Sequence, residues 1–359
     1  MNPSPRSDYM HWAKTRQAAR FNLAVSGVPG LPLNELPGAL DDVELNGAST
    51  YGWPPLQQAL AQTLQVDADR IVHAAGTSMA NHLAMAVCFR PGDEVLVEHP
   101  TYELLLATAA YLGASIRRIP RRPENRFRLD PADVRAALTP RTRLVVLTNL
   151  HNPSSVRIPD ATLLEVANLA ANQGAHVLVD EVYLDASSEP PPVTSHRLHD
   201  HLLVTSSLTK VYGLSGLRCG WVLARPDLAE RMWRLNDLFG VIPAHPAERI
   251  SVTALRQLPA LRARARALLD ANRDAWNRFL AARSDLECAP LDFGTVAFPK
   301  LKGGRVDLLC STLRERFETT VVPGHFFEMP DHFRVGISAP VDRFAEGLRR
   351  LGLALDALP

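Results

Sequence analysis

The 359-residue sequence has few lysines, few cysteines, almost no net charge and no long apolar run. No stretch reaches the roughly 18 consecutive apolar residues that a membrane-spanning helix needs, so we expect no membrane partner. The 39 basic and 38 acidic residues nearly balance, and a net charge of +1 gives no field that would attract nucleic acid. The four cysteines form neither a CxxC pair nor a zinc-ligand spacing. We therefore expect no metal site and interpret them as free thiols of a cytoplasmic protein.

Lysine is nearly absent, which makes each lysine informative. Only Lys14, Lys210, Lys300 and Lys302 are present, and the other 35 basic residues are arginines. Where a surface cation suffices, this chain uses arginine. Lysine differs from arginine because its amine can lose its proton and act as a nucleophile, whereas the guanidinium stays protonated. Lys210, which lies among small and apolar residues, is the candidate nucleophile; an exposed lysine in a glycine-rich loop is the alternative.

Short apolar segments alternate with amphipathic segments through the middle of the chain. We predict strands over residues 94–98, 115–119, 143–148, 176–180 and 202–206, and helices over residues 102–112, 130–138 and 160–173. This alternation predicts an α/β fold whose large domain has a mostly parallel, doubly wound sheet with helices on both faces.

The pattern changes after about residue 243. An Arg/Ala/Leu-rich stretch predicts one extended helix over residues 249–283, which Pro259 could kink. Short strands near residues 295–299, 320–322 and 333–337 and helices over 306–317 and 341–355 follow. We interpret this part of the chain as a smaller α+β domain.

Two segments contain residue types that bind phosphate. Ser207 and Arg218 flank Lys210 and supply a hydroxyl donor and a bidentate guanidinium. Thr77 and Ser78 come just before a helix predicted over residues 79–89, and amides at a helix N-terminus bind phosphate with the help of the helix dipole. A simple N-cap by Thr77 or Ser78 is the alternative for the second segment.

Two charged residues, Asp180 and Arg334, lie in predicted strands that are otherwise mostly apolar. Asp180 ends the strand over residues 176–180, at the edge where doubly wound sheets bind ligands. A helix N-cap is the alternative for Asp180. Arg334 lies inside an apolar strand, where a guanidinium is costly unless it meets an anion. That anion is either a bound ligand or an internal Asp or Glu.

The segment around Lys210 resembles the S-x-x-K-x-x-G-L-x-G-x-R-x-G signature of class I/II aminotransferases, which are enzymes of fold type I. The matching residues are Ser207, Lys210, Gly213, Leu214, Gly216, Arg218 and Gly220. The resemblance spans roughly residues 21–338 and implies pyridoxal 5′-phosphate (PLP), held by Lys210 as a Schiff base. It also implies three parts of the chain: residues 1–30 as a segment that packs on the small domain and the active site, residues 31–243 as the large PLP-binding domain, and residues 244–359 as a long linking helix and the small domain.

The resemblance assigns roles around the PLP ring. It places Asp180 beside the pyridinium nitrogen, where an anion raises the pKa of that nitrogen and keeps the ring an electron sink. Tyr183 and Asn152 would hydrogen-bond the ring O3′, and Tyr102 would stack on the ring unless it is a core tyrosine. The turn after Asn152 has Ser155 where the family usually has glycine.

The remaining assignments concern the phosphate and the substrate. Ser207, Arg218, Thr77 and Ser78 would bind the cofactor phosphate, and Tyr51 would reach the phosphate of a partner subunit, although the spacing after Tyr51 is shorter than usual. Asn152, Arg334 and the backbone of Gly27 would bind the substrate, with an ordinary turn as the alternative at Gly27. His151 could also reach the substrate or be merely packed.

The reaction implied is PLP-dependent transfer of an amino group from an L-amino acid to a 2-oxo acid, by a ping-pong Schiff-base mechanism in a homodimer. Lys210 would move the Cα proton, with Asp180 and Tyr183 as the other catalytic residues. Another fold-type-I reaction, such as that of a β-lyase, decarboxylase or racemase, is the first alternative because it would use the same residues. A PLP-binding sensor that is not an enzyme is the second. Such proteins carry a DNA-binding module before the PLP domain, whereas only about twenty residues precede the match here.

Overall fold

The computed structural model describes residues 6–41, 43–48, 50–187 and 192–358, so residues 1–5 of the predicted N-terminal segment lie outside it. The helices of the described residues are α1 (Asp8–Thr15), α2 (Pro54–Leu64), α3 (Gly76–Cys88), α4 (Glu103–Tyr111), α5 (Pro131–Ala137), α6 (Asp160–Ala171), α7 (Pro226–Asn236), α8 (His245–Leu255), α9 (Leu258–Ala281), α10 (Val306–Phe317) and α11 (Val341–Asp356). The strands are β1 (Phe21–Asn22), β2 (Ile71–Ala75), β3 (Glu94–His99), β4 (Ser115–Pro120), β5 (Thr142–Thr148), β6 (His176–Asp180), β7 (Leu202–Ser207), β8 (Cys219–Leu223), β9 (Leu286–Glu287), β10 (Val296–Ala297), β11 (Lys300–Leu301), β12 (Thr319–Thr320), β13 (Val322–Pro323) and β14 (Phe333–Gly336).

A seven-stranded sheet with the order β2-β8-β7-β6-β5-β3-β4 forms the centre of the larger part of the molecule. The pairs from β7 to β4 are parallel, and only β8 is antiparallel to its neighbours β2 and β7. The prediction of a mostly parallel sheet is confirmed. None of the helices among the described residues is long and apolar enough to cross a membrane.

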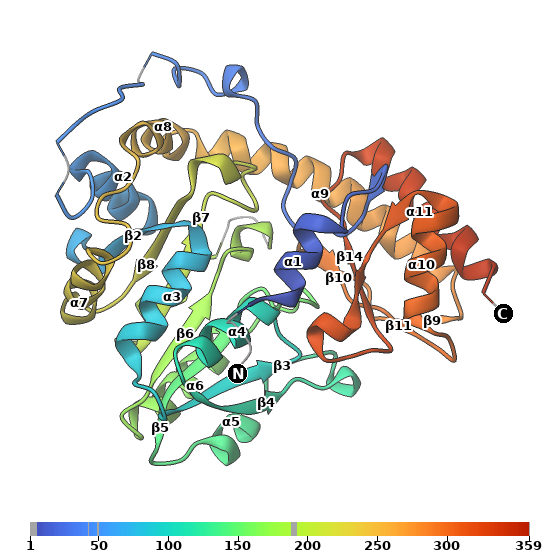
Figure 1. The fold of residues 1–359 in the computed structure, drawn as a ribbon, viewed down its shortest axis with the longest axis horizontal. Helices are drawn as coiled ribbons and strands as arrows, with labels where there is room; N and C mark the ends of the chain where they lie inside the picture. The colour runs from blue at the N-terminus through green and yellow to red at the C-terminus, as the bar shows by residue number, and fades with distance from the viewer. Residues whose placement is uncertain (1–5, 42, 49, 188–191, 359) are drawn as a thin grey trace.

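Both faces of the central strands β5 and β6 are buried, which explains why these strands are almost continuously apolar. Successive residues of β5 enter opposite cores. Val145 and Leu147 pack in the core that α2, α6 and α9 share, whereas Leu144 and Val146 pack in the core formed with α3, α4 and α7. Figure 1 shows α3 crossing one face of the sheet. Because three of the parallel strands end side by side, their carboxyl ends form one edge on which polar residues gather.

Helix α9 runs from the sheet to the C-terminal elements (Figure 1). The prediction of a single helix over residues 249–283 is wrong, because α8 ends at Leu255 and α9 begins at Leu258. Pro259 has no amide hydrogen to donate to the carbonyl of Leu255, and its ring would clash with the preceding turn. In the first turn of a new helix neither restriction matters, so Pro259 starts α9 rather than kinking a longer helix.

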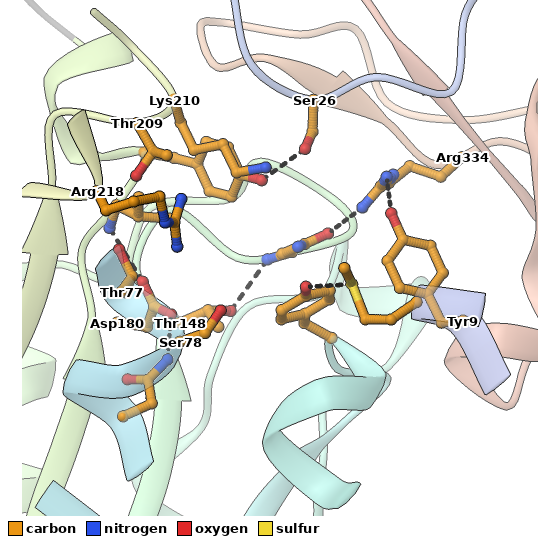
Figure 2. A pocket seen from close by; sticks show the side chains of 16 residues that line it. Tyr9, Ser26, Thr77, Ser78, Thr148, Asp180, Thr209, Lys210, Arg218 and Arg334 are labelled. Carbon is orange, nitrogen blue, oxygen red and sulfur yellow. Dashed lines mark hydrogen bonds between the residues drawn. The ribbon is translucent and has the colours of Figure 1, made fainter. Parts of the chain in front are cut away.

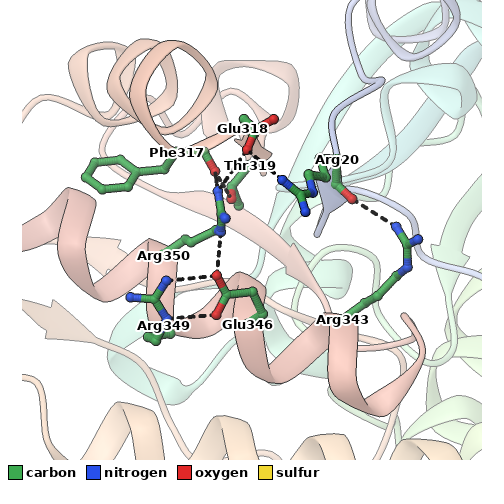
Figure 3. A network of polar contacts seen from close by, with 8 residues as sticks. All are labelled: Arg20, Phe317, Glu318, Thr319, Arg343, Glu346, Arg349 and Arg350. Atoms are coloured by element: carbon green, nitrogen blue, oxygen red, sulfur yellow. Dashed lines mark hydrogen bonds and ion pairs between the residues drawn. The ribbon is translucent and has the colours of Figure 1, made fainter.

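The N-terminal segment is held against the C-terminal part of the chain. Strand β1 pairs in parallel with β12. The guanidinium of Arg350 lies 4.2 Å from the ring centroid of Phe21, and Arg343 donates to the carbonyl of Arg20 at 3.2 Å. Figure 3 shows these arginines around the start of the segment. From this anchor the chain continues to Gly27, beside the candidate site.

Candidate active site

A cavity of about 190 Å³ lies at the carboxyl ends of β5, β6 and β7, between the sheet and β14. Nine residues predicted from the sequence line it: Thr77, Ser78, Tyr102, Asn152, Asp180, Tyr183, Lys210, Arg218 and Arg334. Seven further residues line it that were not predicted: Tyr9, Met10, Ser26, Asn81, Thr148, Val182 and Thr209. Figure 2 shows Lys210 and Arg218 on one side of the cavity and Arg334 with Tyr9 on the other.

Lys210 enters the cavity three residues after β7 ends. Burial lowers the pKa of the Lys210 ammonium, which favours the neutral amine that a nucleophile or a base requires. The backbone of Gly27 packs on this residue, since a Cβ at Gly27 would lie 3.3 Å from Cδ of Lys210. The next amide, that of Val28, donates to the Lys210 carbonyl at 2.9 Å. Gly27 therefore touches the lysine rather than forming an isolated turn.

Asp180 ends β6 and points into the cavity. Burial raises the pKa of its carboxyl to about 6, and hydrogen bonds from the side chain of Asn81 and the amide of Val182 oppose that rise. The Asn81 amide donates to Oδ2 at 2.8 Å, and Val182 donates to Oδ1 at 3.1 Å. The Thr205 hydroxyl donates to Oδ1 of Asn81 at 2.6 Å, which fixes the orientation of that amide. Asp180 is not a helix N-cap, because the next helical turn is preceded by Tyr183.

Helix α3 begins earlier than predicted, at Gly76 rather than Met79. Thr77 and Ser78 therefore lie in its first turn, where their amides have no intrahelical partner. The N-cap position is Ala75 without a side-chain cap, so the N-cap interpretation of Thr77 and Ser78 is wrong.

The segment after Lys210 is packed against this helix start. Arg218 donates to the carbonyl of Ala75 at 3.0 Å, and a Cβ on Gly76 (φ +77°) would lie 2.8 Å from the Arg218 Cζ. The Thr77 hydroxyl donates to Oγ of Ser207 at 2.8 Å. A helix N-terminus, two hydroxyls and a guanidinium thus converge at one end of the cavity, an arrangement that suits a phosphate.

Arg334 lies at the other end of the cavity and is 1% exposed. Its guanidinium donates to Oδ1 of Asn152 at 2.9 Å, to the hydroxyl of Tyr9 at 2.8 Å and to the carbonyl of Ala24 at 3.1 Å. Nε has no partner among the described residues. All of these acceptors are neutral, and within the described residues no Asp or Glu forms an ion pair with Arg334. The internal salt bridge considered from the sequence is therefore wrong, and the guanidinium remains available for an anionic ligand.

Two predicted tyrosines line the space between the two ends. The Tyr183 hydroxyl donates to Oγ of Ser26 at 2.7 Å, and burial raises the pKa of the Tyr183 phenol. Tyr102 packs edge-on against Tyr9 with ring centroids 5.6 Å apart, and its hydroxyl contacts the sulfur of Met10 at 3.3 Å. Tyr102 thus presents its ring to the cavity, and its stacking role stays a prediction.

Four residues considered from the sequence are not among those that line the cavity: Gly27 and Ser207 contact the lining residues Lys210 and Thr77, and the other two are Tyr51 and His151. Tyr51 is 45% exposed, and its hydroxyl accepts from Arg234 at 2.9 Å, so it does not reach this chain's own site. His151 is buried, with Nδ1 2.6 Å from Oγ of Ser154 and Nε2 2.9 Å from the carbonyl of Pro100. Burial holds the pKa of His151 well below its usual range. His151 therefore fixes the turn rather than facing a substrate.

The serine in the turn after Asn152 has a structural explanation. Ser155 adopts a φ of +62°, in the left-handed region that favours glycine. Its hydroxyl donates to the carbonyl of Val296 at 2.7 Å. This bond links the turn to β10 and offsets part of the backbone strain.

The charged side chains that line the cavity indicate the charge of the ligand that it would suit. Arg218 and Arg334 contribute two guanidinium groups and Lys210 a basic amine, whereas Asp180 is the single carboxylate among the described lining residues. The cavity therefore suits a ligand with several negative charges. An amine, a buried carboxylate and a phosphate-sized cradle together fit an aldehyde that carries a basic ring nitrogen and a phosphate, and Arg334 leaves a separate place for a carboxylate.

Comparison with known proteins gives a consistent result. Residues 26–351 match the family model described as aminotransferase class I and II. The chain is 32% identical over 358 residues to the capreomycidine synthase of Streptomyces vinaceus, and 29% identical over 365 residues to an arginine–pyruvate transaminase of Pseudomonas aeruginosa; each match covers 96% of this chain and 92% of the relative.

Solved structures share the fold. A PLP-dependent aminotransferase from Streptococcus suis has a TM-score of 0.91 at 24% identity, covering 99% of this chain and 98% of that one. The PLP-dependent cyclase OrfR has a TM-score of 0.88 at 24% identity, covering 99% of both chains.

Proposed function

The chain belongs to the class I and II aminotransferase family, and on that premise we propose that it transfers an amino group from an L-amino acid to a 2-oxo acid. The predicted fold class is confirmed as fold type I, and the family's cofactor is PLP. The transamination itself is the proposal, and it rests on the arrangement of the cavity.

The residues of the cavity fit PLP. Lys210 would hold its aldehyde carbon, Asp180 would meet the ring nitrogen, and Tyr183 and Asn152 would bind the ring oxygen. The phosphate would be bound by Thr77, Ser78, Ser207 and Arg218. When bound, PLP supplies an electron sink for the electron pair of a broken bond at the substrate Cα. Asp180 supports that sink because an anion beside the ring nitrogen keeps the nitrogen protonated.

The observation that carries the proposal is the buried Arg334 guanidinium without a carboxylate partner among the described residues. A guanidinium binds a carboxylate through two parallel hydrogen bonds, so Arg334 would hold the α-carboxylate of an amino acid. That anchor fixes the orientation of the Cα–H bond relative to Lys210. The Lys210 amine, whose pKa burial lowers, is the base that would take the Cα proton and later return it.

We also propose a cytoplasmic homodimer. What supports the dimer is that Tyr51 is exposed and lies outside this chain's own cavity, so in a dimer it would be free to serve the phosphate site of the second copy. All four cysteines are free thiols, which suits a reducing compartment.

A second candidate is a different PLP reaction at the same site. The favouring observation is that one relative is a capreomycidine synthase and one solved structure with this fold is a PLP-dependent cyclase. The residues that would bind PLP and the carboxylate serve either reaction. The outcome depends on which substrate bond lies perpendicular to the ring, which the side chain of the substrate influences.

The test uses the PLP-loaded protein and single L-amino acids. We expect one amino acid to convert the yellow cofactor band to the pyridoxamine phosphate spectrum and to yield one equivalent of its 2-oxo acid. A second 2-oxo acid should then restore the band. Release of ammonia, carbon dioxide or a cyclised product without restoration by any 2-oxo acid would contradict transamination and favour the second candidate.

A further inference from the structure

Tyr9 comes from the N-terminal helix α1 and lines the cavity, although it lies outside residues 26–351 that match the family model. It is 7% exposed. Its ring packs edge-on against Tyr102 and Phe326, with centroids 5.6 Å apart in each case. The Arg334 guanidinium lies 5.6 Å from the Tyr9 ring centroid. The ring is therefore fixed by aromatic packing that does not involve its hydroxyl.

Helix α1 is attached to both sides of the cavity. At its N-terminus the Ser7 hydroxyl accepts from the amide of Met10 at 3.0 Å and donates to Glu103 at the start of α4. At its C-terminal end Arg314 of α10 donates to the carbonyl of Arg16. The helix thus holds Tyr9 in place between the sheet and the C-terminal part of the chain.

The Tyr9 hydroxyl has a hydrogen for which the described part of the chain supplies no acceptor. Its oxygen accepts from Nη2 of Arg334 at 2.8 Å. Within the described residues, no hydrogen bond has the Tyr9 hydroxyl as its donor. A phenol can accept and donate at once, so one donor of this buried group remains for a ligand in the cavity. A buried donor without an acceptor is unfavourable, which makes an occupant that accepts it favourable.

We propose that Tyr9 is a second donor to the substrate carboxylate, beside Arg334; this inference rests on the proposed function. Because the Tyr9 oxygen and Nη2 of Arg334 are already in hydrogen-bond contact, an oxygen that accepts from Arg334 lies within reach of the Tyr9 hydroxyl. The carboxylate then receives hydrogen bonds from a cation and a neutral donor, and its binding gives the free hydrogen an acceptor. The amino acid and the 2-oxo acid both carry this carboxylate, so Tyr9 acts on both substrates equally.

The experiment measures binding without requiring turnover. Pyruvate is titrated calorimetrically into the PLP-loaded protein, with pyruvamide as the neutral counterpart of similar shape. In Tyr9→Phe the ring packing stays and only the hydroxyl is lost. We expect Tyr9→Phe to weaken pyruvate binding about tenfold or more, since a hydrogen bond to a charged group is lost, and to leave pyruvamide binding unchanged. Equal Kd values of Tyr9→Phe and the unmodified protein for pyruvate would overturn the inference.

Two further variants separate a direct contact from an indirect one. Ser7→Ala loosens α1 without touching Arg334 and should not reproduce the loss of pyruvate selectivity; if it does, Tyr9 is only structural. In the Arg334→Gln background, Tyr9→Phe should still lower the second-order rate constant with an amino acid severalfold. Complete loss of the Tyr9 effect there would mean that Tyr9 acts only through Arg334, which would also overturn the inference. If the unmodified protein does not prefer pyruvate over pyruvamide, the proposed carboxylate site itself fails.

Discussion

Removal of the Asn81 amide should move the pH dependence of cofactor binding upward. Asn81 donates to Oδ2 of Asp180 at 2.8 Å, inside a region where Asn81 and Asp180 are each 5% exposed and Thr205 is fully buried. Burial already raises the pKa of Asp180 to about 6. A hydrogen bond to a buried charged group stabilises that charge by about 1.5–3 kcal/mol. Since 1.36 kcal/mol corresponds to one pH unit, Asn81→Ala should raise the pKa of Asp180 by a further one to two units.

The assay is the Kd of PLP for the apoprotein between pH 5 and pH 9. Only ionised Asp180 can pair with a protonated ring nitrogen, so affinity should fall below about pH 6 in the unmodified protein. In Asn81→Ala the fall should begin about one to two pH units higher. Titrating groups of PLP itself act equally in all variants, so the difference between them reports Asp180.

Thr205→Val is the matched control. It removes the bond from Thr205 to Oδ1 of Asn81 but leaves the Asn81 amide free to donate to Asp180. We expect its pH profile to move by less than about half a pH unit, because the charge keeps its donor. An unchanged profile in Asn81→Ala, or equal shifts in the two variants, would refute the reasoning.

Three other substitutions test separate parts of the site. Arg334→Lys keeps the charge but loses the planar fork, so kcat/KM for the amino acid should fall about 100-fold or more; a change within threefold would argue against a bidentate carboxylate site. Burial raises the pKa of Glu181 to about 7, so the folded chain binds more protons than the unfolded chain between about pH 4.5 and 7, and stability falls as pH rises through that window. Glu181→Gln should remove this fall, so the free energy of unfolding of the apoprotein should rise at pH 8 relative to pH 4 by about 3 kcal/mol at most, seen as a higher Tm at pH 8; an equal change at both pH values would contradict the account. A Cβ on Gly220 would lie 2.5 Å from the backbone carbon of Gly76, so Gly220→Ala should cost about 1–3 kcal/mol of unfolding free energy and weaken PLP binding. Gly216→Ala, where a Cβ would have open space, is its control, and equal Tm losses in the two variants would show that the close approach of Gly76 is not the cause.

Much of the site was predictable because parallel strands place their carboxyl ends at one edge. Asp180 and Ser207 end neighbouring strands, and Thr77 in the first turn of α3 donates to Ser207. The local sequence patterns of strands and helices are sufficient to predict that these residues lie at the same edge of the sheet. The cost of an unpaired guanidinium in an apolar strand was likewise enough to select Arg334 as a candidate anion-binding residue.

Other features depend on contacts that no local pattern contains. Tyr9 and Arg334 are 325 residues apart in sequence, so nothing near Tyr9 indicates its place in the cavity. Asn81 had a weak signal, a polar residue within the apolar helix α3, but its partner Asp180 is 99 residues away. The break between α8 and α9 was not predicted, because the amino-acid composition favours helix on both sides of Pro259. The point at which α8 ends depends on the local backbone, which composition does not describe.

The most direct test of the account is to find where PLP is attached. The chain has only four lysines, so borohydride reduction of the PLP-loaded protein, followed by peptide mapping, can distinguish all of them. The account predicts one phosphopyridoxyl group, on Lys210, and no yellow cofactor band in Lys210→Ala. A label on Lys14, Lys300 or Lys302 instead, or an unchanged band in Lys210→Ala, would contradict it.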